Sequence, residues 1–426
     1  MRKPIILGFA IALIGALGAG GQTPPLPEIV SVAKSGSVLD LLSRLGFDFL
    51  ADRNGRLYIV APPGDVQRLE SLEIPFRYET WSFAPTIPRR ATQGGPIGAF
   101  HTGPQLEKDL LDLQARHPGL AKVFDIGRSL ENRPIYALKI SDNVAAEEDE
   151  AETLILGCHH AREWISVEVP FLLGKTLLER YASDPEVRQI VDQSEIWIVP
   201  LVNPDGHDYS VRVYRYWRKN RRDSGGGDFG VDINRNYGFQ WGIDNVGSSP
   251  NPASEVYRGT SAFSEPETRA VRDLFLRKDF RAVVSYHSYS QAILYPWGYT
   301  AVPPPDAGTL RDLGGRMAGL IREVNGRTYD VGPGIVTLAY LTNGDTIDWT
   351  YGTAGVPSYT IELPPVDQLG GGFFNREEDI QPIFRENLPA LFYLLEWAAN
   401  DYAARPRVPS PELKEILRPM VGRPRR

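Results

Sequence analysis

Near-continuous apolar runs that alternate with amphipathic helical patterns constrain the fold of residues 98–402 more than any other feature of this sequence. The runs are Tyr136–Ile140, Thr153–Leu156, Glu195–Val199, Ala282–Tyr286 and Tyr359–Ile361, and the helical patterns include Pro104–Arg116, Val167–Tyr181 and Glu267–Leu276, the last opened by a capping box of Ser264 and Glu267. A strand that is apolar along its whole length is buried on both faces, which is typical of a sheet covered by helices on each side. We therefore expect an α/β domain whose mixed, largely parallel, twisted sheet has helices on both faces.

Residues 27–80 form a separate small unit. Helical spacing at Val38–Leu45 and Pro63–Leu72, with a strand at Leu57–Ala61 between them, predicts a compact α+β domain. Residues 81–97 follow as an exposed linker rich in proline and glycine. The Arg89–Arg90 pair in this linker is either part of a plain connector or a cleavage site for an activating protease. Residues 403–426 are basic and rich in proline, which predicts a disordered or loosely docked tail.

Residues 1–21 have the layout of a secretory signal peptide, because Arg2 and Lys3 precede an apolar run from Ile5 to Leu17 and small residues follow. No other stretch is apolar and long enough to cross a bilayer. The single cysteine, Cys158, leaves no intrachain disulfide and is expected to be a small buried residue. The net charge of −7 gives no sign of a nucleic-acid partner. We expect a secreted or periplasmic monomer without a membrane partner.

Histidines near the ends of the apolar runs are candidate metal ligands. His160 and Glu163 lie three positions apart after the second run, and we expect them on the first turn of a helix, where both side chains reach one cation. His159 and Glu163 are four apart, so spacing alone leaves the choice between the two histidines open. His287, at the end of the fourth run, supplies a third ligand. Three protein ligands leave the fourth position of zinc open for water, as at a catalytic site.

Glu362 closes the last apolar run, where a carboxylate is costly to bury unless it forms an ion pair or takes part in catalysis. A structural salt bridge is one interpretation. Beside a zinc-bound water, Glu362 would instead take a proton during attack and return it to the leaving amine. Two other histidines give no such signal: His117 precedes a proline and His207 follows a turn expected at Asn203–Gly206, so both are expected to face solvent.

A further cluster holds cationic and amide side chains: Arg215 and Arg218, then Asn234 and Arg235 within Asp232–Asn236. Loops rich in charge are usually solvated surface. An arginine fork, however, matches a carboxylate through two parallel hydrogen bonds, and a neighbouring asparagine adds donors. This set would hold the anionic end of a substrate, while another arginine would stabilise a developing oxyanion.

From Phe100 to Glu362 the sequence resembles the zinc metallocarboxypeptidases of the carboxypeptidase A/B type. The resemblance rests on motifs that follow one another in the family's order: His160–Trp164, Asn203–Gly206, Trp217–Asn220, Asp232–Asn236, His287–Ser290 and Ile347–Trp349. Several independent motifs are a far more specific signal than one His-x-x-Glu pair. The resemblance also favours His160 over His159, since the family's ligand directly precedes the Ala-Arg-Glu segment.

This resemblance implies a secreted zinc carboxypeptidase with one Zn²⁺ per chain, acting on peptides with a free C-terminus. It implies that His160, Glu163 and His287 bind zinc, that Glu362 is the general base, that Arg218 holds the oxyanion, that Asn234, Arg235 and Tyr340 bind the terminal carboxylate, and that Arg162, Arg215, Ser288 and Tyr289 contact the substrate. A clamp on the free carboxylate limits how far the peptide enters, so only its last peptide bond reaches the metal. The 27–80 unit is similar to the family's inhibitory propeptide in position and size, and would cover the cleft until the linker is cut.

The expected specificity depends on two residues. Ile347 occupies the family's pocket-floor position, which implies aliphatic or aromatic C-terminal residues, whereas Asp345 would add basic ones if its carboxylate faces the same pocket. A hydrophobic and a mixed hydrophobic/basic preference therefore both stay open. Two other functions also stay open: a zinc amidohydrolase of the same fold acting on cell-wall peptides or acyl-amino acids, and an inactive module that binds peptide C-termini.

Overall fold

The computed structural model describes residues 28–79 except 46, 54 and 62, residues 97–366 except 339, and residues 372–404. The predicted signal peptide, the Arg89–Arg90 pair and the tail beyond Ala404 lie outside these ranges and stay predictions. In the described ranges, no helix combines the length and the apolar character needed to span a membrane.

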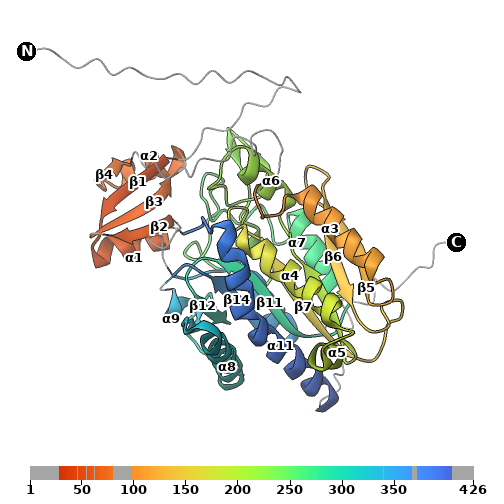
Figure 1. The fold of residues 1–426 in the computed structure, drawn as a ribbon. Coiled ribbons are helices and arrows are strands. Elements are labelled where there is room, and N and C mark those ends of the chain that lie inside the picture. Colours follow the sequence, from red (N-terminus) through yellow and green to blue (C-terminus); the bar gives the residue numbers. More distant parts are fainter. Residues whose placement is uncertain are drawn as a thin grey trace, which may run out of the picture.

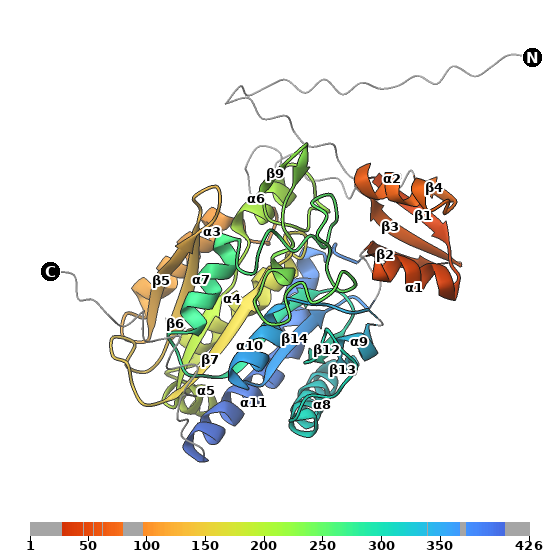
Figure 2. The same cartoon turned by 180° about the vertical axis from the view of Figure 1, so that it is seen from behind.

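An eight-stranded mixed sheet forms the centre of the larger domain (Figures 1 and 2). Its spatial order is β13 (Asp330–Pro333), β12 (Ala292–Tyr295), β14 (Ser358–Leu363), β11 (Phe280–Ser288), β7 (Ala151–Gly157), β8 (Ser194–Val199), β6 (Pro134–Ile140) and β5 (Ala121–Arg128). The neighbours β14, β11, β7 and β8 run parallel, and antiparallel pairs flank them on both sides. The prediction of a mixed, largely parallel sheet is confirmed.

Helices cover both faces of this sheet, as predicted (Figures 1 and 2). One face packs against α3 (Gly103–Arg116), α4 (Ile165–Arg180), α5 (Pro185–Val191), α8 (Ala307–Asn325) and α11 (Ile380–Ala404), and the other against α7 (Pro266–Phe275) and α10 (Thr346–Ala354). Each face has its own apolar core. In β7, Ile155 packs into the core on the α4 and α11 face, and Leu154 and Leu156 pack into the core on the α7 face. Burial on both faces explains why this strand is apolar along its length.

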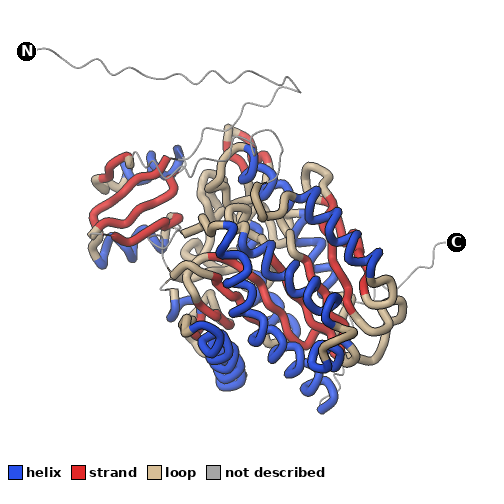
Figure 3. Tube along the Cα trace, in the orientation of Figure 1, coloured by secondary structure: helices blue, strands red, loops and turns tan. Residues whose placement is uncertain are grey.

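Short elements and long loops gather at one end of the sheet (Figure 3). These elements are α6 (Pro204–Arg212), β9 (Asp223–Gly225), β10 (Asp228–Phe229), the 3₁₀ turn η2 (Ile233–Arg235), α9 (Gly334–Thr337) and the 3₁₀ turn η4 (Glu377–Asp379). In a sheet with parallel central strands, this is the end where side chains from several strands converge.

The N-terminal unit has a four-stranded antiparallel sheet beside the larger domain (Figure 1). Its order is β2 (Asp48–Arg53), β3 (Arg56–Ala61), β1 (Glu28–Ala33) and β4 (Phe76–Tyr78), with α1 (Gly36–Arg44) and α2 (Pro63–Ser71) completing the unit. Its own core includes Val30, Leu42, Leu57 and Leu69. The sequence patterns identified both helices and β3 but missed β1, β2 and β4.

Two predictions about helix starts are wrong. Glu265 is the N-cap of α7 and makes no side-chain cap bond, and the Ser264 hydroxyl donates instead to the Glu265 carboxylate at 2.7 Å. Asn203 does not begin a free turn but caps α6, where its side-chain oxygen accepts a hydrogen bond from the Gly206 amide at 3.0 Å. Both helices have proline in the first helical position, which is the stronger start signal.

The prediction that His207 faces solvent is also wrong. This residue is 1% exposed in α6, with its ring 6.1 Å from the ring of Trp164, and neither ring nitrogen has a hydrogen-bond partner among the described residues. Burial, assisted by the positive charge of Arg215, lowers the pKa of His207 to about 3. His117 is partly exposed. A turn-like sequence therefore says little about burial once the turn belongs to a packed helix.

Candidate metal centre and active site

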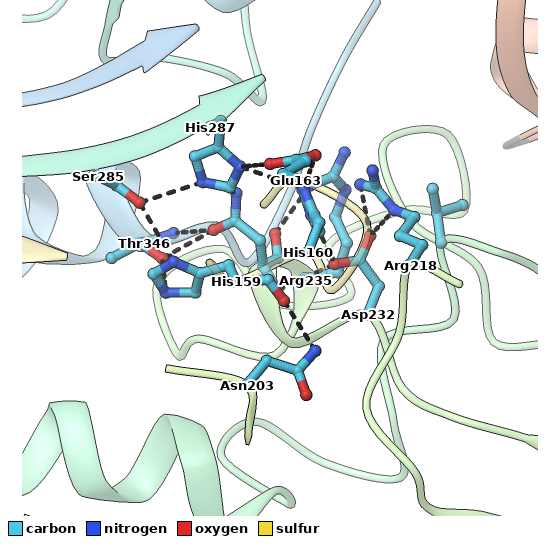
Figure 4. Close-up of polar contacts among 12 residues, drawn as sticks. His159, His160, Glu163, Asn203, Arg218, Asp232, Arg235, Ser285, His287 and Thr346 are labelled. Atoms are coloured by element: carbon cyan, nitrogen blue, oxygen red, sulfur yellow. Dashed lines mark hydrogen bonds and ion pairs between the residues drawn. The ribbon is translucent and has the colours of Figure 1, made fainter. Parts of the chain in front are cut away.

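Three neighbouring strands bring the predicted catalytic residues together at one end of the sheet. Figure 4 shows the side chains of His160, Glu163 and His287 pointing toward one another. His287 is the penultimate residue of β11, and Glu362 is its direct register partner on the parallel strand β14. His160 and Glu163 follow β7, which pairs with the other edge of β11. The strand-end argument thus identified segments that do meet in space.

The prediction that His160 and Glu163 share the first turn of a helix is wrong, because α4 begins only at Ile165. They lie in a preceding turn, in which the Glu163 amide donates to the His160 carbonyl oxygen at 3.1 Å. Their side chains still meet, with His160 Nδ1 2.8 Å from Glu163 Oε1. Cys158 precedes this turn and is fully buried, as predicted.

The ligand atoms of His160, Glu163 and His287 converge on one point. His287 Nδ1 lies 3.0 Å from Glu163 Oε2 and 3.1 Å from His160 Nδ1, and all three residues are buried. A tetrahedral zinc with bonds of about 2.0–2.1 Å separates its ligand atoms by about 3.3 Å, close to these distances. Two imidazole nitrogens facing one carboxylate are poorly arranged without a cation between them. The donor set therefore fits zinc.

The carboxylate of Asp232 links this metal centre to Arg218. One oxygen lies 3.2 Å from His160 Nε2, and the other accepts hydrogen bonds from Arg218 Nε and Nη2 at 3.1 and 2.8 Å. Burial alone would raise the pKa of Asp232, but Arg218, Arg235 and His160 hold it well below its usual range. An anionic Asp232 orients the His160 ring so that Nδ1 faces the metal position.

Asn234 and Arg235 lie beside the metal centre on η2. Asn234 Nδ2 is 3.5 Å from His287 Nε2. Arg235 donates from Nε to the Gly247 carbonyl at 3.0 Å and from Nη1 to the Asn234 carbonyl at 2.8 Å, which leaves Nη2 without a partner in the part of the chain that the structure describes. This guanidinium is 3% exposed and held rigidly, with one donor group left for an anion.

Tyr340 and Glu362 both lie near the charged groups of Arg218, Arg235 and Glu163. Burial of the Tyr340 hydroxyl and the nearby Glu362 carboxylate raise the pKa of Tyr340 to about 12, although 39% of the residue is exposed. Burial, opposed by His287 and assisted by Glu163, raises the pKa of Glu362 to about 8. A divalent cation bound beside Glu362 would lower that value. Glu362 is therefore suited to exchange a proton near neutral pH.

Three of the four remaining predicted contact residues gather around Phe373. The Arg162 guanidinium lies 4.0 Å from the centroid of the Phe373 ring, and the Tyr289 ring is 4.8 Å from it. Arg215 stacks on Trp164 at 3.7 Å and donates to the Arg162 and Phe373 carbonyl oxygens, so much of its donor capacity is used within the protein. Ser288 lies next to the metal centre, where its amide donates to Glu163 Oε2 at 3.2 Å.

Asp345 and Ile347 lie at the start of α10. Asp345 is its N-cap: one carboxylate oxygen accepts from the Asp348 amide at 2.8 Å, and the other accepts from the Thr342 hydroxyl. Burial raises the pKa of Asp345. Ile347 is 6% exposed. The Asp345 carboxylate, which would admit basic residues if it faced the pocket, thus already accepts two hydrogen bonds at the start of α10.

Comparison with protein families matches residues 106–390 of this chain to the zinc carboxypeptidases. The chain belongs to that family. Carboxypeptidase A2 of Mus musculus is 33% identical over 303 residues, which cover 70% of each chain. A zinc carboxypeptidase of Saccharothrix mutabilis subsp. capreolus is 30% identical over 424 residues, covering 92% of this chain and 95% of the relative.

Among solved structures, that of thrombin activatable fibrinolysis inhibitor has a TM-score of 0.73 and 26% identity, and it covers 88% of this zinc carboxypeptidase and 99% of its own chain. The protein is accordingly a metallocarboxypeptidase that uses one zinc ion per chain. The ligand atoms of His160, Glu163 and His287 converge and Glu362 lies beside His287 in the strand register, so the described residues give no support to an inactive binding module.

Four residues of this zinc carboxypeptidase site were not assigned roles from the sequence: His159, Asp232, Ser285 and Thr346. They make the hydrogen bonds that surround the ligands and the clamp (Figure 4). Asp232 stands two positions before Asn234, and Ser285 stands two positions before His287 on the same strand. Proximity to a predicted functional residue was the available signal, but it does not tell which face a side chain takes.

Proposed function

We propose that this zinc carboxypeptidase removes single residues from peptides with a free C-terminus, through the residues described above. The observation that carries the proposal is the arrangement of Arg235 and Asn234 beside the convergent ligand atoms of His160, Glu163 and His287. An anion clamp next to a metal centre fixes the distance between the terminal carboxylate and the reacting bond.

Each side chain has a separate task in this mechanism. When bound, zinc acts as a Lewis acid and lowers the pKa of water that it holds. Glu362 takes the proton of the attacking water and delivers it to the leaving amine. Arg218, fixed by Asp232, donates to the oxyanion that develops on the scissile carbonyl, while Arg235 and Tyr340 hold the terminal carboxylate.

We propose a preference for aliphatic or aromatic C-terminal residues, with basic residues accepted less well. The buried side chain of Ile347 favours apolar groups at the start of α10. The Asp345 carboxylate is buried there too, but it already accepts hydrogen bonds from Thr342 and Asp348. A lysine or arginine would have to compete with those donors, so its gain from the ion pair is reduced.

A peptide series that differs only in its last residue, with each peptide in free-acid and C-terminal amide form, tests this function. We expect the free acids to lose one residue, with leucine and phenylalanine released faster than lysine and arginine. Amidation removes the charge that Arg235 binds, so cleavage is expected to slow at least about 100-fold, since a hydrogen bond to a charged group is worth about 1.5–3 kcal/mol and Asn234 and Tyr340 lose their bonds as well. Mass spectrometry of the products measures both effects.

Digestion with a chelator present is the control, since a zinc-dependent reaction stops in both forms. Equal cleavage of acid and amide would exclude the carboxylate clamp, and release of internal fragments would exclude exopeptidase action. Rapid release of lysine and arginine alone would contradict the proposed specificity.

We also propose that the N-terminal unit inhibits the enzyme until the linker is cut. Ile29 of β1 and Tyr58 of β3 pack against the aromatic cluster of Tyr216 and Phe373, and Phe373 contacts the predicted substrate residue Arg162. At a second contact, a β-carbon on Gly64 of α2 would lie 2.5 Å from the Ala253 Cβ of the larger domain. These contacts put the small unit against side chains that a substrate would have to reach.

Cutting the chain in the linker is expected to raise peptidase activity at least about tenfold, because it lets the N-terminal unit leave this aromatic cluster. Tyr58→Ala should raise the activity of the uncut chain for the same reason. Tyr78→Ala, in the same sheet but 57% exposed, is the matched control and should change nothing. Initial rates on a short blocked peptide before and after trypsin measure the effect. Equal rates for cut and uncut chains would exclude inhibition.

The signal-like residues 1–21 support export of the enzyme, and we propose that it acts outside the cytoplasm as a monomer. The absence of a disulfide is consistent with a domain held by its two buried cores and by its metal.

A further inference from the structure

His159 is the sequence neighbour of the metal ligand His160, but its ring contacts a different set of groups (Figure 4). It is fully buried, and both ring nitrogens have partners: Nδ1 lies 3.2 Å from Ser285 Oγ, and Nε2 lies 2.8 Å from Tyr237 Oη and 3.1 Å from Thr346 Oγ1. Nothing in the proposed mechanism uses this side chain directly.

Ser285 connects His159 to the zinc ligand His287. Its hydroxyl oxygen lies 3.1 Å from His287 Nε2, the ring nitrogen on the side away from the metal position. When Nδ1 of His287 binds the metal, Nε2 carries the proton and donates it to Ser285. The Ser285 hydroxyl is then free to donate to His159 Nδ1. The two imidazole rings also stack, with centroids 5.5 Å apart and an interplanar angle of 18°.

Thr346 connects His159 to the carboxylate clamp. Because His159 Nδ1 accepts a hydrogen bond, the neutral ring carries its proton on Nε2 and donates it toward Tyr237 and Thr346. The Thr346 hydroxyl donates in turn to Asn234 Oδ1 at 2.7 Å, and the Thr346 amide donates to the same oxygen at 3.0 Å. With Oδ1 held by two donors, Nδ2 of Asn234 is the group left to bind a carboxylate.

We propose that His159 is a positioning residue that fixes the orientation of both the zinc ligand His287 and the clamp residue Asn234, through Ser285 and Thr346. The proposal rests on the proposed function for the roles of those two residues. A single arrangement of protons satisfies the four hydrogen bonds that join these five side chains, from His287 to Asn234. Replacing His159 is therefore expected to disturb both His287 and Asn234, although these two residues are 53 positions apart in the sequence.

Two substitutions separate the Ser285 contact of His159 from its Thr346 contact, and we call these contacts the two branches. An asparagine amide lies near the Nδ1 position of histidine, and a glutamine amide lies near the Nε2 position. His159→Gln loses the bond to Ser285 and is expected to weaken zinc binding about 10- to 100-fold, as loss of an outer hydrogen-bond partner does. Its KM at saturating zinc should change less than about threefold. His159→Asn loses the bond to Thr346 and is expected to raise KM for a short blocked dipeptide up to about tenfold, roughly one hydrogen bond. Its zinc affinity should change less than about threefold.

Zinc affinity is measured on the metal-free full chain by competition with a chromophoric chelator, which requires no turnover. KM is measured on the same preparation, treated with trypsin if the uncut chain is inactive. Ser285→Ala, alone and combined with His159→Gln, is the matched control. If the two residues act through one bond, the double variant binds zinc no more weakly than the weaker single variant. Melting curves in EDTA verify that each variant is folded.

Zinc affinities and KM values equal to wild type in both His159 variants would overturn the proposal, and so would additive effects of Ser285→Ala and His159→Gln on zinc binding. The proposal would also be overturned if both variants showed the same loss of zinc affinity and the same rise in KM. That result is expected of a residue that only fills space. These outcomes presuppose an active, zinc-binding wild type. A wild-type chain without zinc-dependent hydrolysis would instead overturn the proposed function.

Discussion

Glu362→Gln is expected to lower kcat/KM by about 10²- to 10⁴-fold, the range that general acid–base catalysis contributes, while zinc remains bound. Glutamine has nearly the same shape as glutamate but does not accept a proton at neutral pH. Zinc is expected to stay because Glu362 is the register neighbour of the proposed ligand His287 and is not itself one of the three converging residues. Steady-state kinetics and metal analysis on one preparation measure both quantities.

The pH profile gives a second test of the same residue. The base must be ionised, so activity is expected to fall on acidification, with a midpoint below pH 8 because the metal opposes the burial that raises the pKa of Glu362. Residual activity of the variant should lack this acid limb. Glu323→Gln, on the solvent face of α8 with a side chain 64% exposed, is the control and should leave both the rate and the profile unchanged. Full activity of a zinc-loaded Glu362→Gln variant would remove Glu362 as the base.

Acid is expected to destabilise the enzyme through His207. The pKa of this buried ring is lowered to about 3, against an ordinary value near 6.5, so between these pH values the unfolded chain binds a proton that the folded chain does not. Stability therefore falls as pH falls, by about 1.4 kcal/mol per pH unit and at most about 5 kcal/mol in total from this residue. His207→Phe should remove that loss. At pH 7 it should be neutral or stabilising, because two unpartnered buried nitrogens disappear.

Denaturant unfolding in EDTA from pH 7 down to pH 4.5 measures the difference between wild type and His207→Phe. The gap in unfolding free energy should widen steadily as pH falls below 6.5. His117→Phe, the same replacement at a partly exposed histidine, controls for loss of a titrating ring as such and should give a smaller change with pH. Parallel pH curves for wild type and His207→Phe would show that His207 titrates normally in the folded protein.

Strand ends were the most predictable part of the site. Apolar runs located β7, β11 and β14, and the histidines and carboxylates at their ends predicted a metal centre with a base beside it, while the family resemblance favoured His160 over His159. The prediction of a helix at His160 and Glu163 was wrong. Their side chains still meet, because a turn also brings residues three positions apart together. Whether side chains meet at a strand end therefore depends little on whether a helix or a turn follows the strand.

Contacts between distant segments were not predictable from local patterns. His159 and Thr346 are 187 positions apart, and their hydrogen bond exists only because the sheet register and the start of α10 meet beside β11. The burial of His207 likewise follows from packing of α6 against Trp164 and not from its own neighbours in the sequence. The edge strand β4 of the N-terminal unit was missed because its three residues, Phe76–Tyr78, give little periodicity.

The pairing of His287 with Glu362 on adjacent parallel strands has a consequence for engineering. Neighbouring strands are about 4.8 Å apart whatever side chains they carry, so the backbone ladder itself sets the separation between the proposed base Glu362 and the proposed ligand His287. Grafting a different segment between Gly334 and Asp345, with Tyr340 kept in place, is expected to change which peptides fit, while the positions of His287 and Glu362 are inherited from β11 and β14. New selectivities are therefore best sought by exchanging that segment, with both strands left untouched.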